Sequence, residues 1–281
     1  MNAHAWTREL QVGEGFRLAD VDPDGKPGFS GGKAEGARAL AAGLDDLNEL
    51  QERLFAESRA GVAKDAVLLV LQAMDSAGKG GIVRHVVGGV DPQGVSLTAF
   101  KAPTDEERAH DFLWRIEKRL PEPGFIGVFD RSHYEDVLVV KVRKLAEASV
   151  IEGRYSRIND FEAELTASGV TVVKCFLHID FDEQRERLLA RLDDPAKHWK
   201  FREGDIDDRQ LWPAFEDAYA AALGRCSTAQ SPWYVIPSNK KWYRNWAIAS
   251  ILLETFEDMN LSYPEVDLDF KRLKERLAPP N

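Results

Sequence analysis

The chain is poor in cysteine, with only Cys175 and Cys226 among its 281 residues. These two residues form neither a metal-binding spacing nor a disulfide framework, which fits a reducing compartment. Long apolar runs are also lacking, since no stretch approaches the roughly 18 consecutive apolar residues of a membrane-spanning helix. The first residues do not show the basic-then-apolar pattern of a secretory signal. Together these absences predict a cytoplasmic protein that does not enter a membrane.

Positive charge is in deficit as well. Lys and Arg number 37 against 47 Asp and Glu, so the formal net charge is −10. This balance argues against nucleic acid as the main ligand, because duplex-binding proteins usually carry a basic excess. A smaller polyanion remains compatible, because a local basic cleft can attract it despite an acidic average. Such clusters exist, although each can also be an ordinary solvated helix face: Lys141, Arg143, Lys144, Arg154 and Arg157 in one stretch, and Lys197, Lys200 and Arg202 in another.

What the chain does have is a regular alternation of apolar runs and amphipathic stretches. Continuous apolar runs are typical of parallel strands that are buried on both faces, and their alternation with helical patterns indicates a parallel sheet covered by helices. Residues 1–34 are rich in Gly, Asp and Pro and are interpreted as an irregular arm. We predict one α/β domain over 35–265 and a C-terminal tail over 266–281. The predicted strands are 66–71, 95–100, 125–129, 170–179 and 233–237, and the predicted helices are 35–59, 104–118, 132–145, 157–168, 181–192 and 242–258.

The loop after the first strand has the composition of a phosphate-binding loop. In LLVLQAMDSAGKGG a buried strand leads into glycines and Lys79, and then into a helical continuation. Unpaired backbone N–H groups at a helix start attract phosphate oxygens, and the lysine adds a full charge. Ala73 replaces the usual first glycine, and Gly80 replaces the Ser or Thr that normally binds magnesium. An ordinary glycine-rich turn is the alternative. The predicted phosphate-binding residues of this loop are Asp75, Ser76, Ala77, Gly78, Lys79, Gly80 and Gly81.

Two aspartates are candidates for the metal site that Gly80 cannot complete. Asp75 lies inside the loop, and Asp130 closes the third strand, where a carboxylate beside a P-loop can bind magnesium. The alternatives are a turn-forming Asp75 and a helix-capping Asp130. Arg131 follows and can brace phosphates, whereas Glu135 stands at capping-box spacing from Ser132 and can simply terminate a helix.

A third signal lies between the fourth and fifth strands. The segment RLDDPAKHWKFREGDIDDR, residues 191–209, is charged and interrupted by Pro and Gly. P-loop kinases often carry a lid at this place, because phosphoryl transfer needs water excluded and negative charge neutralised. Arg191, Lys197, Lys200 and Arg202 are candidates to close over phosphates. The alternative is an exposed charged helix.

Taken together, the segments LQAMDSAGKGG, FKAPTDEE, FDRSHYED, RLDDPAKHWKF and WYVIPSNKKWYRNW resemble the polyphosphate kinase 2 family over about residues 35–265. The resemblance implies a P-loop NTPase fold, a thymidylate-kinase-like three-layer α/β/α sandwich with a five-stranded parallel sheet and a helical lid at about 191–212. It implies Lys79, Asp130, Arg131 and Arg191 as catalytic residues, and Asp75 and Asp130 as ligands of Mg2+.

The resemblance also implies the substrates, inorganic polyphosphate and adenine or guanine nucleotides, and a homo-oligomer, either dimer or tetramer. The segment SHYED resembles the branch that accepts both AMP and ADP, with Glu135 and Arg131 at the acceptor. Lys141, Lys144, Lys197 and Lys200 are further candidates for binding the polyphosphate. A diphosphate-only polyphosphate kinase, an ATP-dependent P-loop kinase of a small metabolite, and a nucleotide-binding module without turnover are the alternatives.

Overall fold

The computed structural model describes residues 6–277 and contains one five-stranded parallel sheet, in the order β2-β3-β1-β4-β5. The central strand β1 is buried at every residue because it has neighbours on both edges and helices on both faces. The five predicted strands are confirmed, with ends shifted by at most two residues. Their bounds are β1 Ala66–Ala73, β2 Val95–Ala99, β3 Ile126–Asp130, β4 Val170–His178 and β5 Trp233–Pro237.

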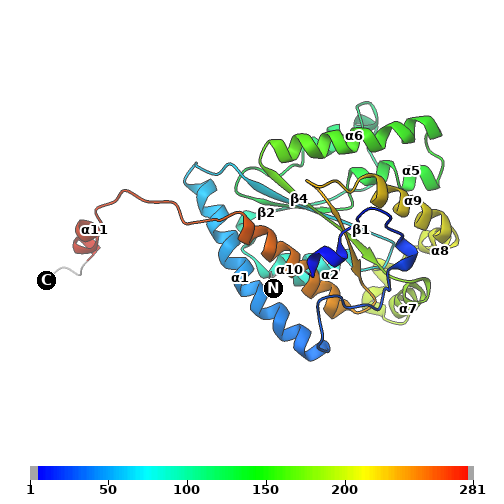
Figure 1. Ribbon diagram of the computed structural model, residues 1–281, viewed down its shortest axis with the longest axis horizontal. Helices are drawn as coiled ribbons and strands as arrows, with labels where there is room; N and C mark the ends of the chain where they lie inside the picture. Colours follow the sequence, from blue (N-terminus) through cyan, green and yellow to red (C-terminus); the bar gives the residue numbers. More distant parts are fainter. Residues whose placement is uncertain (1–5, 278–281) are drawn as a thin grey trace.

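Helices cover both faces of this sheet, which confirms the predicted α/β/α architecture (Figure 1). Helices α1 and α10 lie side by side on one face, and α6 lies on the other. The α-helices are α1 Lys33–Arg59, α2 Lys79–His85, α3 Asp105–Arg108, α4 Trp114–Glu117, α5 Val139–Val142, α6 Ala148–Ala167, α7 Phe181–Leu192, α8 Gly204–Gln210, α9 Trp212–Arg225, α10 Lys241–Asp258 and α11 Phe270–Leu277. Short 3-10 turns are η1 Thr7–Leu10, η2 Leu18–Asp20, η3 Val87–Gly89, η4 Pro92–Gly94, η5 His133–Asp136 and η6 Pro195–Lys200.

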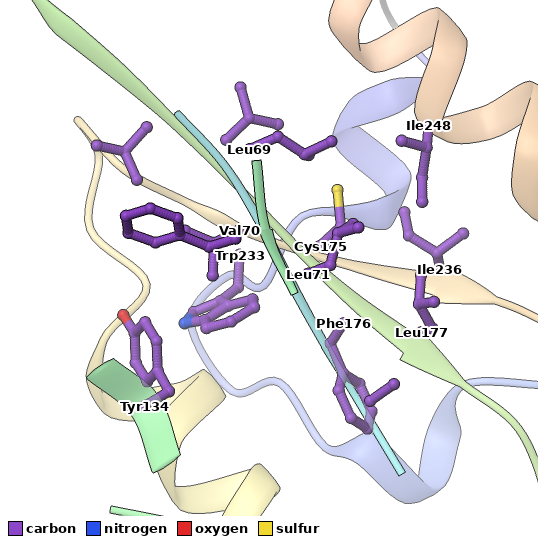
Figure 2. Close-up of a cluster of buried hydrophobic side chains, with 14 of the residues drawn as sticks. Leu69, Val70, Leu71, Tyr134, Cys175, Phe176, Leu177, Trp233, Ile236 and Ile248 are labelled. Carbon is purple, nitrogen blue, oxygen red and sulfur yellow. The ribbon is translucent and has the colours of Figure 1, made fainter. Parts of the chain in front are cut away.

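The core follows the alternation of side chains along the strands. Cys175, Leu177 and Ile236 point to the face covered by Ile248 of α10, whereas Trp233 points to the opposite face (Figure 2). Successive residues of a strand face opposite sides of the sheet, so apolar residues at every position bury both faces. These runs therefore specify a central sheet rather than a surface one.

Two stretches that were predicted as single helices are each divided into two shorter elements. Residues 104–118 form two short helices, α3 and α4, because Asp111 accepts a hydrogen bond from the backbone N–H of Leu113 (3.0 Å) and thereby starts a new turn. Residues 132–145 form the 3-10 turn η5 and then α5. The backbone leaves helical geometry at Val137 and Leu138 between them.

Between residue 6 and the start of α1, the chain forms the short turns η1 and η2 and packs against the sheet. Its backbone N–H at Val12 bonds the carbonyl of Trp233 on β5 (2.9 Å), and Leu10 and Leu18 are buried. Residues 1–5 and 278–281, the ends of the predicted arm and tail, lie outside the described residues.

A buried ion pair ties β4 to α6 beneath the segment that follows β3. Lys174 and Glu162 are both fully buried, and Lys174 Nζ lies 2.5 Å from Glu162 Oε2. The other oxygen, Oε1, accepts a hydrogen bond from Tyr134 Oη (2.8 Å) and lies 3.1 Å from His133 Nε2. Burial opposes ionisation of Glu162, but Lys174 and His133 outweigh it and hold its pKa below the usual value. The network anchors the residues that follow Asp130 and Arg131, and it gives His133 a structural role.

Candidate active site

The predicted phosphate-binding loop lies at the carboxyl end of β1. β1 ends at Ala73 and α2 begins at Lys79, so residues 74–78 form the connection. Ser76 has φ 67° and Gly78 has φ 110°, both in the left-handed region. Ser76 carries a side chain in a conformation that costs of order 1 kcal/mol, and backbone strain of this kind concentrates at ligand-binding loops. The fold therefore holds the loop in a conformation that its sequence alone would not adopt.

Strand register brings Asp130 to this loop. Leu71 of β1 pairs with Asp130 at the end of β3, and the N–H of Arg131 bonds the carbonyl of Leu71 (3.1 Å). The side chains of Lys79 and Asp130 then meet, with Lys79 Nζ 3.8 Å from Asp130 Oδ1. Lys79 is 13% and Asp130 30% exposed, so both charges are partly shielded but reachable. A cation at the start of α2 and a carboxylate at the end of β3 thus lie close together.

Arg131 and Glu135 extend the site along the segment after β3. Arg131 is a second non-glycine residue with positive φ (65°), and its Nη1 lies 3.9 Å from Glu135 Oε2. Both line a narrow cavity of about 60 Å³ together with Asp75 and Lys79. The remaining lining residues are Ala73, Met74, Val139, Gln184, Asp208, Trp212, Phe215 and Tyr219.

Arg191 reaches the loop from the last turn of α7. Its Nη1 lies 3.4 Å from Asp75 Oδ2 and 3.5 Å from Asp205 Oδ2, and it donates to the carbonyl of Lys200 (3.2 Å). Burial raises the pKa of Asp205, and the charge of Asp75 acts in the same direction. Arg191 thus links the loop aspartate to the segment that was predicted to be a lid.

The other predicted basic residues lie apart from this cavity. Lys141 and Lys144 line a separate groove of about 740 Å³ between α5 and α6, so they are not brought together with Lys79. Lys197 pairs with Asp194 (2.8 Å), and Lys200 Nζ lies 4.9 Å from the ring centre of Trp199. The lysines predicted to bind polyphosphate therefore fall into two groups, one in the groove beside α6 and one in the turn η6.

Sequence reasoning missed several residues of the site. Arg187 and Arg244 are buried directly behind the loop, and Tyr219 donates to the carbonyl of Ala73 (2.8 Å). Arg187 precedes Arg191 by four residues on α7, and this spacing on one helix face was a usable signal. The position of Arg244 depends on how α10 packs against α2, for which the sequence carries no local signal.

The donor chemistry fits a magnesium ion that is held partly by substrate. In residues 6–277 no group of three His, Cys, Asp or Glu side chains converges tightly enough to hold a metal alone. Mg2+ commonly binds through one or two carboxylates plus phosphate oxygens and keeps its remaining waters. Asp75 and Asp130, on either side of Lys79, are the side chains that would hold it. At Gly80 a Cβ atom would meet nothing within 4 Å, so the missing hydroxyl does not reflect crowding.

Comparison with known proteins places this geometry in a family. The model of polyphosphate kinase 2 (PPK2) matches residues 32–264. The AMP/ADP-polyphosphate phosphotransferase of Meiothermus ruber is 49% identical over 250 residues, 89% of this chain and 92% of that protein. The ADP-polyphosphate phosphotransferase of Rhodopseudomonas palustris is 41% identical over 277 residues, 92% of each chain. The crystal structure of Polyphosphate Kinase 2 from Arthrobacter aurescens TC1 superposes with a TM-score of 0.93 at 54% identity, covering 96% of this chain and 95% of that chain.

The structure also allows the helices to be checked against the requirements of a membrane span. Within residues 6–277, none of the helices combines the length and the apolar character that crossing a bilayer requires.

Proposed function

The chain belongs to the polyphosphate kinase 2 family and is a polyphosphate–nucleotide phosphotransferase, and from this premise we propose that it phosphorylates both AMP and ADP at the loop 74–81, with Mg2+. The observation that carries the assignment of the site is the approach of Lys79 Nζ to Asp130 Oδ1 at 3.8 Å. Two chain segments far apart in sequence there supply the cation and the carboxylate that phosphoryl transfer requires.

The reaction needs no protein nucleophile. A phosphate oxygen of AMP or ADP attacks the terminal phosphorus of polyphosphate, the bond from that phosphorus to its bridging oxygen breaks, and a chain one phosphate shorter leaves. The transition state is loose, so catalysis consists mainly of positioning and charge neutralisation. Lys79 neutralises oxygens of the transferring group, and Arg131 and Arg191 bind flanking phosphates. When bound, Mg2+ would add positive charge at the same oxygens.

A donor–acceptor matrix tests this function. Polyphosphate or ATP is supplied separately with AMP, ADP, GMP and GDP, and the products are separated by ion-exchange chromatography. We expect ADP and then ATP from AMP with polyphosphate as the only donor. Phosphorylation that requires ATP would instead favour an ATP-dependent small-molecule kinase. Tight nucleotide binding without turnover from any donor would favour a binding module.

Glu135 is proposed to set the preference between AMP and ADP. It lies 3.9 Å from Arg131 and lines the cavity with it, whereas His133 is fully buried and bonds Glu162. Within the segment SHYED, Glu135 therefore lines the cavity, whereas His133 does not. Its carboxylate partly neutralises the charge of Arg131. Without it, Arg131 would attract the second phosphate of a diphosphate more strongly.

We expect Glu135→Asn to lower kcat/KM for AMP about 10-fold to 100-fold, because Arg131 loses the ion pair that holds it at the acceptor and misplaced substrate-positioning groups cost rates of this order, and to lower that for ADP less. Initial rates with saturating polyphosphate measure both values. Glu164→Gln, on an exposed position of α6, is the matched control. Equal losses for AMP and ADP would contradict a role in acceptor choice.

The C-terminal segment supports the proposal that the enzyme is a homo-oligomer, either dimer or tetramer. Helix α11 lies away from the body of the chain (Figure 1) and carries no buried residue. Val266, Leu268, Phe270 and Leu277 are all more than half exposed. Exposed apolar side chains in this number are typical of interaction surfaces. We expect light scattering to give at least twice the chain mass of 31.5 kDa, and a chain shortened to residue 262 to give a smaller assembly. A monomeric full-length chain would contradict the proposal.

A further inference from the structure

Two arginines are buried against the phosphate-binding loop, and neither of them lines the cavity. Arg187 of α7 is 8% exposed. Its Nη1 donates to the carbonyls of Ser76 (3.1 Å) and Ala77 (2.7 Å), and its Nη2 donates to the carbonyl of Ser238 (2.7 Å). Its Nε bonds Glu183 Oε1 at 2.5 Å, so this cation is paired. Arg187 therefore holds two loop carbonyls without lining the cavity itself.

Arg244 of α10 approaches the same loop from a second helix and is 3% exposed. Its Nη1 donates to the carbonyl of Ala77 (2.8 Å), and its Nη2 and Nε donate to Asn245 Oδ1 (2.8 and 3.2 Å). A Cβ atom added at Gly78 would lie 1.9 Å from Arg244 Nη1, and one at Gly81 would lie 2.6 Å from Nη2. These two glycines thus make room for the guanidinium, which explains why the loop is glycine-rich beyond the needs of its turn.

The charge of Arg244 has no carboxylate partner. Across residues 6–277, no Asp or Glu oxygen lies within 4.0 Å of its nitrogens, and its hydrogen bonds go to neutral oxygens. Burial lowers the pKa of Arg244 to about 10, and the nearby charge of Arg187 acts in the same direction. The group is still charged at neutral pH. A buried, unpaired cation is costly, so its presence here calls for an anion that binds close by.

We propose that Arg244 is a positioning residue that, with Arg187, fixes the loop carbonyls behind the loop and places an uncompensated positive charge beneath the bound phosphates. The inference rests on the proposed function, since the compensating anion is a phosphate group of the substrate. Holding the carbonyls back leaves the N–H groups of Gly78, Lys79 and Gly80 to face the cavity, whereas those of Ala77 and Gly81 donate to the carbonyls of Met74 and Gly78. The arginines themselves do not contact substrate; they act through the loop.

The test uses the full chain and tripolyphosphate as the probe. Arg244→Met keeps much of the side-chain volume, and Ala77 keeps its bond from Arg187, so we expect the variant to fold. We expect the dissociation constant for tripolyphosphate, measured by calorimetry, to rise about tenfold or more, because a low-dielectric site transmits a nearby charge strongly. The gain in unfolding temperature on adding tripolyphosphate should shrink, while the unfolding temperature without ligand changes little.

These readouts separate an electrostatic role from a merely structural one. A structural residue would lower the unfolding temperature without ligand and leave the affinity of the folded protein unchanged, and that result would overturn the proposal. Arg244→Lys, which keeps the charge, should recover most of the affinity. Arg53→Met on α1 is the control for loss of an arginine elsewhere, and it should bind tripolyphosphate as the wild type does.

Glycine substitutions keep the proposal testable should Arg244→Met fail to fold. Gly81→Ala displaces the guanidinium, so it should weaken tripolyphosphate binding more than Gly80→Ala, where a Cβ meets nothing within 4 Å. Equal effects would contradict the proposal. If the wild-type protein does not bind tripolyphosphate, both the proposed function and this inference are contradicted. If the wild type binds it and Arg244→Met has the same dissociation constant, the inference alone is contradicted.

Discussion

Replacing Lys79 by methionine should lower kcat for ADP formation from polyphosphate and AMP by about 10³-fold, the scale of removing a charge that stabilises the transition state. Lys79 begins α2, its side chain is only 13% exposed, and its ammonium faces Asp130 across the cavity entrance. In this partly dry setting its charge acts on the transferring phosphoryl with little screening by water. Methionine has a similar length, so the packing around the loop should survive.

Steady-state rates and thermal unfolding of the Lys79→Met variant test this expectation together. The unfolding temperature should stay close to that of the wild type while kcat falls. Lys33→Met, at the exposed start of α1, is the control and should keep full activity. A Lys79→Met enzyme with more than a tenth of the wild-type kcat would show that the loop does not bind the transferring group.

The second large effect is expected at Asp130. Changing it to asparagine should lower kcat about 10²-fold to 10³-fold, since it removes a carboxylate that would hold Mg2+ and that faces Lys79. An amide keeps the shape and can still accept a hydrogen bond, so the register of β3 against β1 should be unaffected. The expected fall in kcat would therefore come from the missing negative charge at the site.

The magnesium dependence distinguishes this role from a structural one. In the Asp130→Asn variant the Mg2+ concentration for half-maximal rate should rise several-fold, because one carboxylate ligand is lost. Asp160→Asn, exposed on α6, is the control. An Asp130→Asn enzyme with reduced kcat but an unchanged magnesium response would show that Asp130 acts only through Lys79.

The sheet could be predicted because its strands are buried on both faces. Runs such as residues 66–71 have apolar residues at every position, and only a central parallel strand needs that pattern. Because parallel strands end at the same edge, the two sequence motifs after β1 and β3 had to meet there. The contact between Lys79 and Asp130 follows from the register, not from either motif alone.

Features that depend on tertiary packing could not be predicted in the same way. Arg244 looks like an ordinary solvated residue of an amphipathic helix, and only the packing of α10 against the loop buries it. The separation of Lys141 from Lys79 has the same origin. A cluster of basic residues in sequence shows that charge is present, but the direction in which each helix presents it depends on its neighbours.

The most direct test of the account is a crystal structure with tripolyphosphate, AMP and Mg2+. The account predicts phosphate density against the backbone amides of residues 78–80, within reach of Lys79 and Arg191, with the AMP phosphate beside Arg131. Phosphate density confined to the groove between α5 and α6, with the loop 74–81 left free, would contradict it.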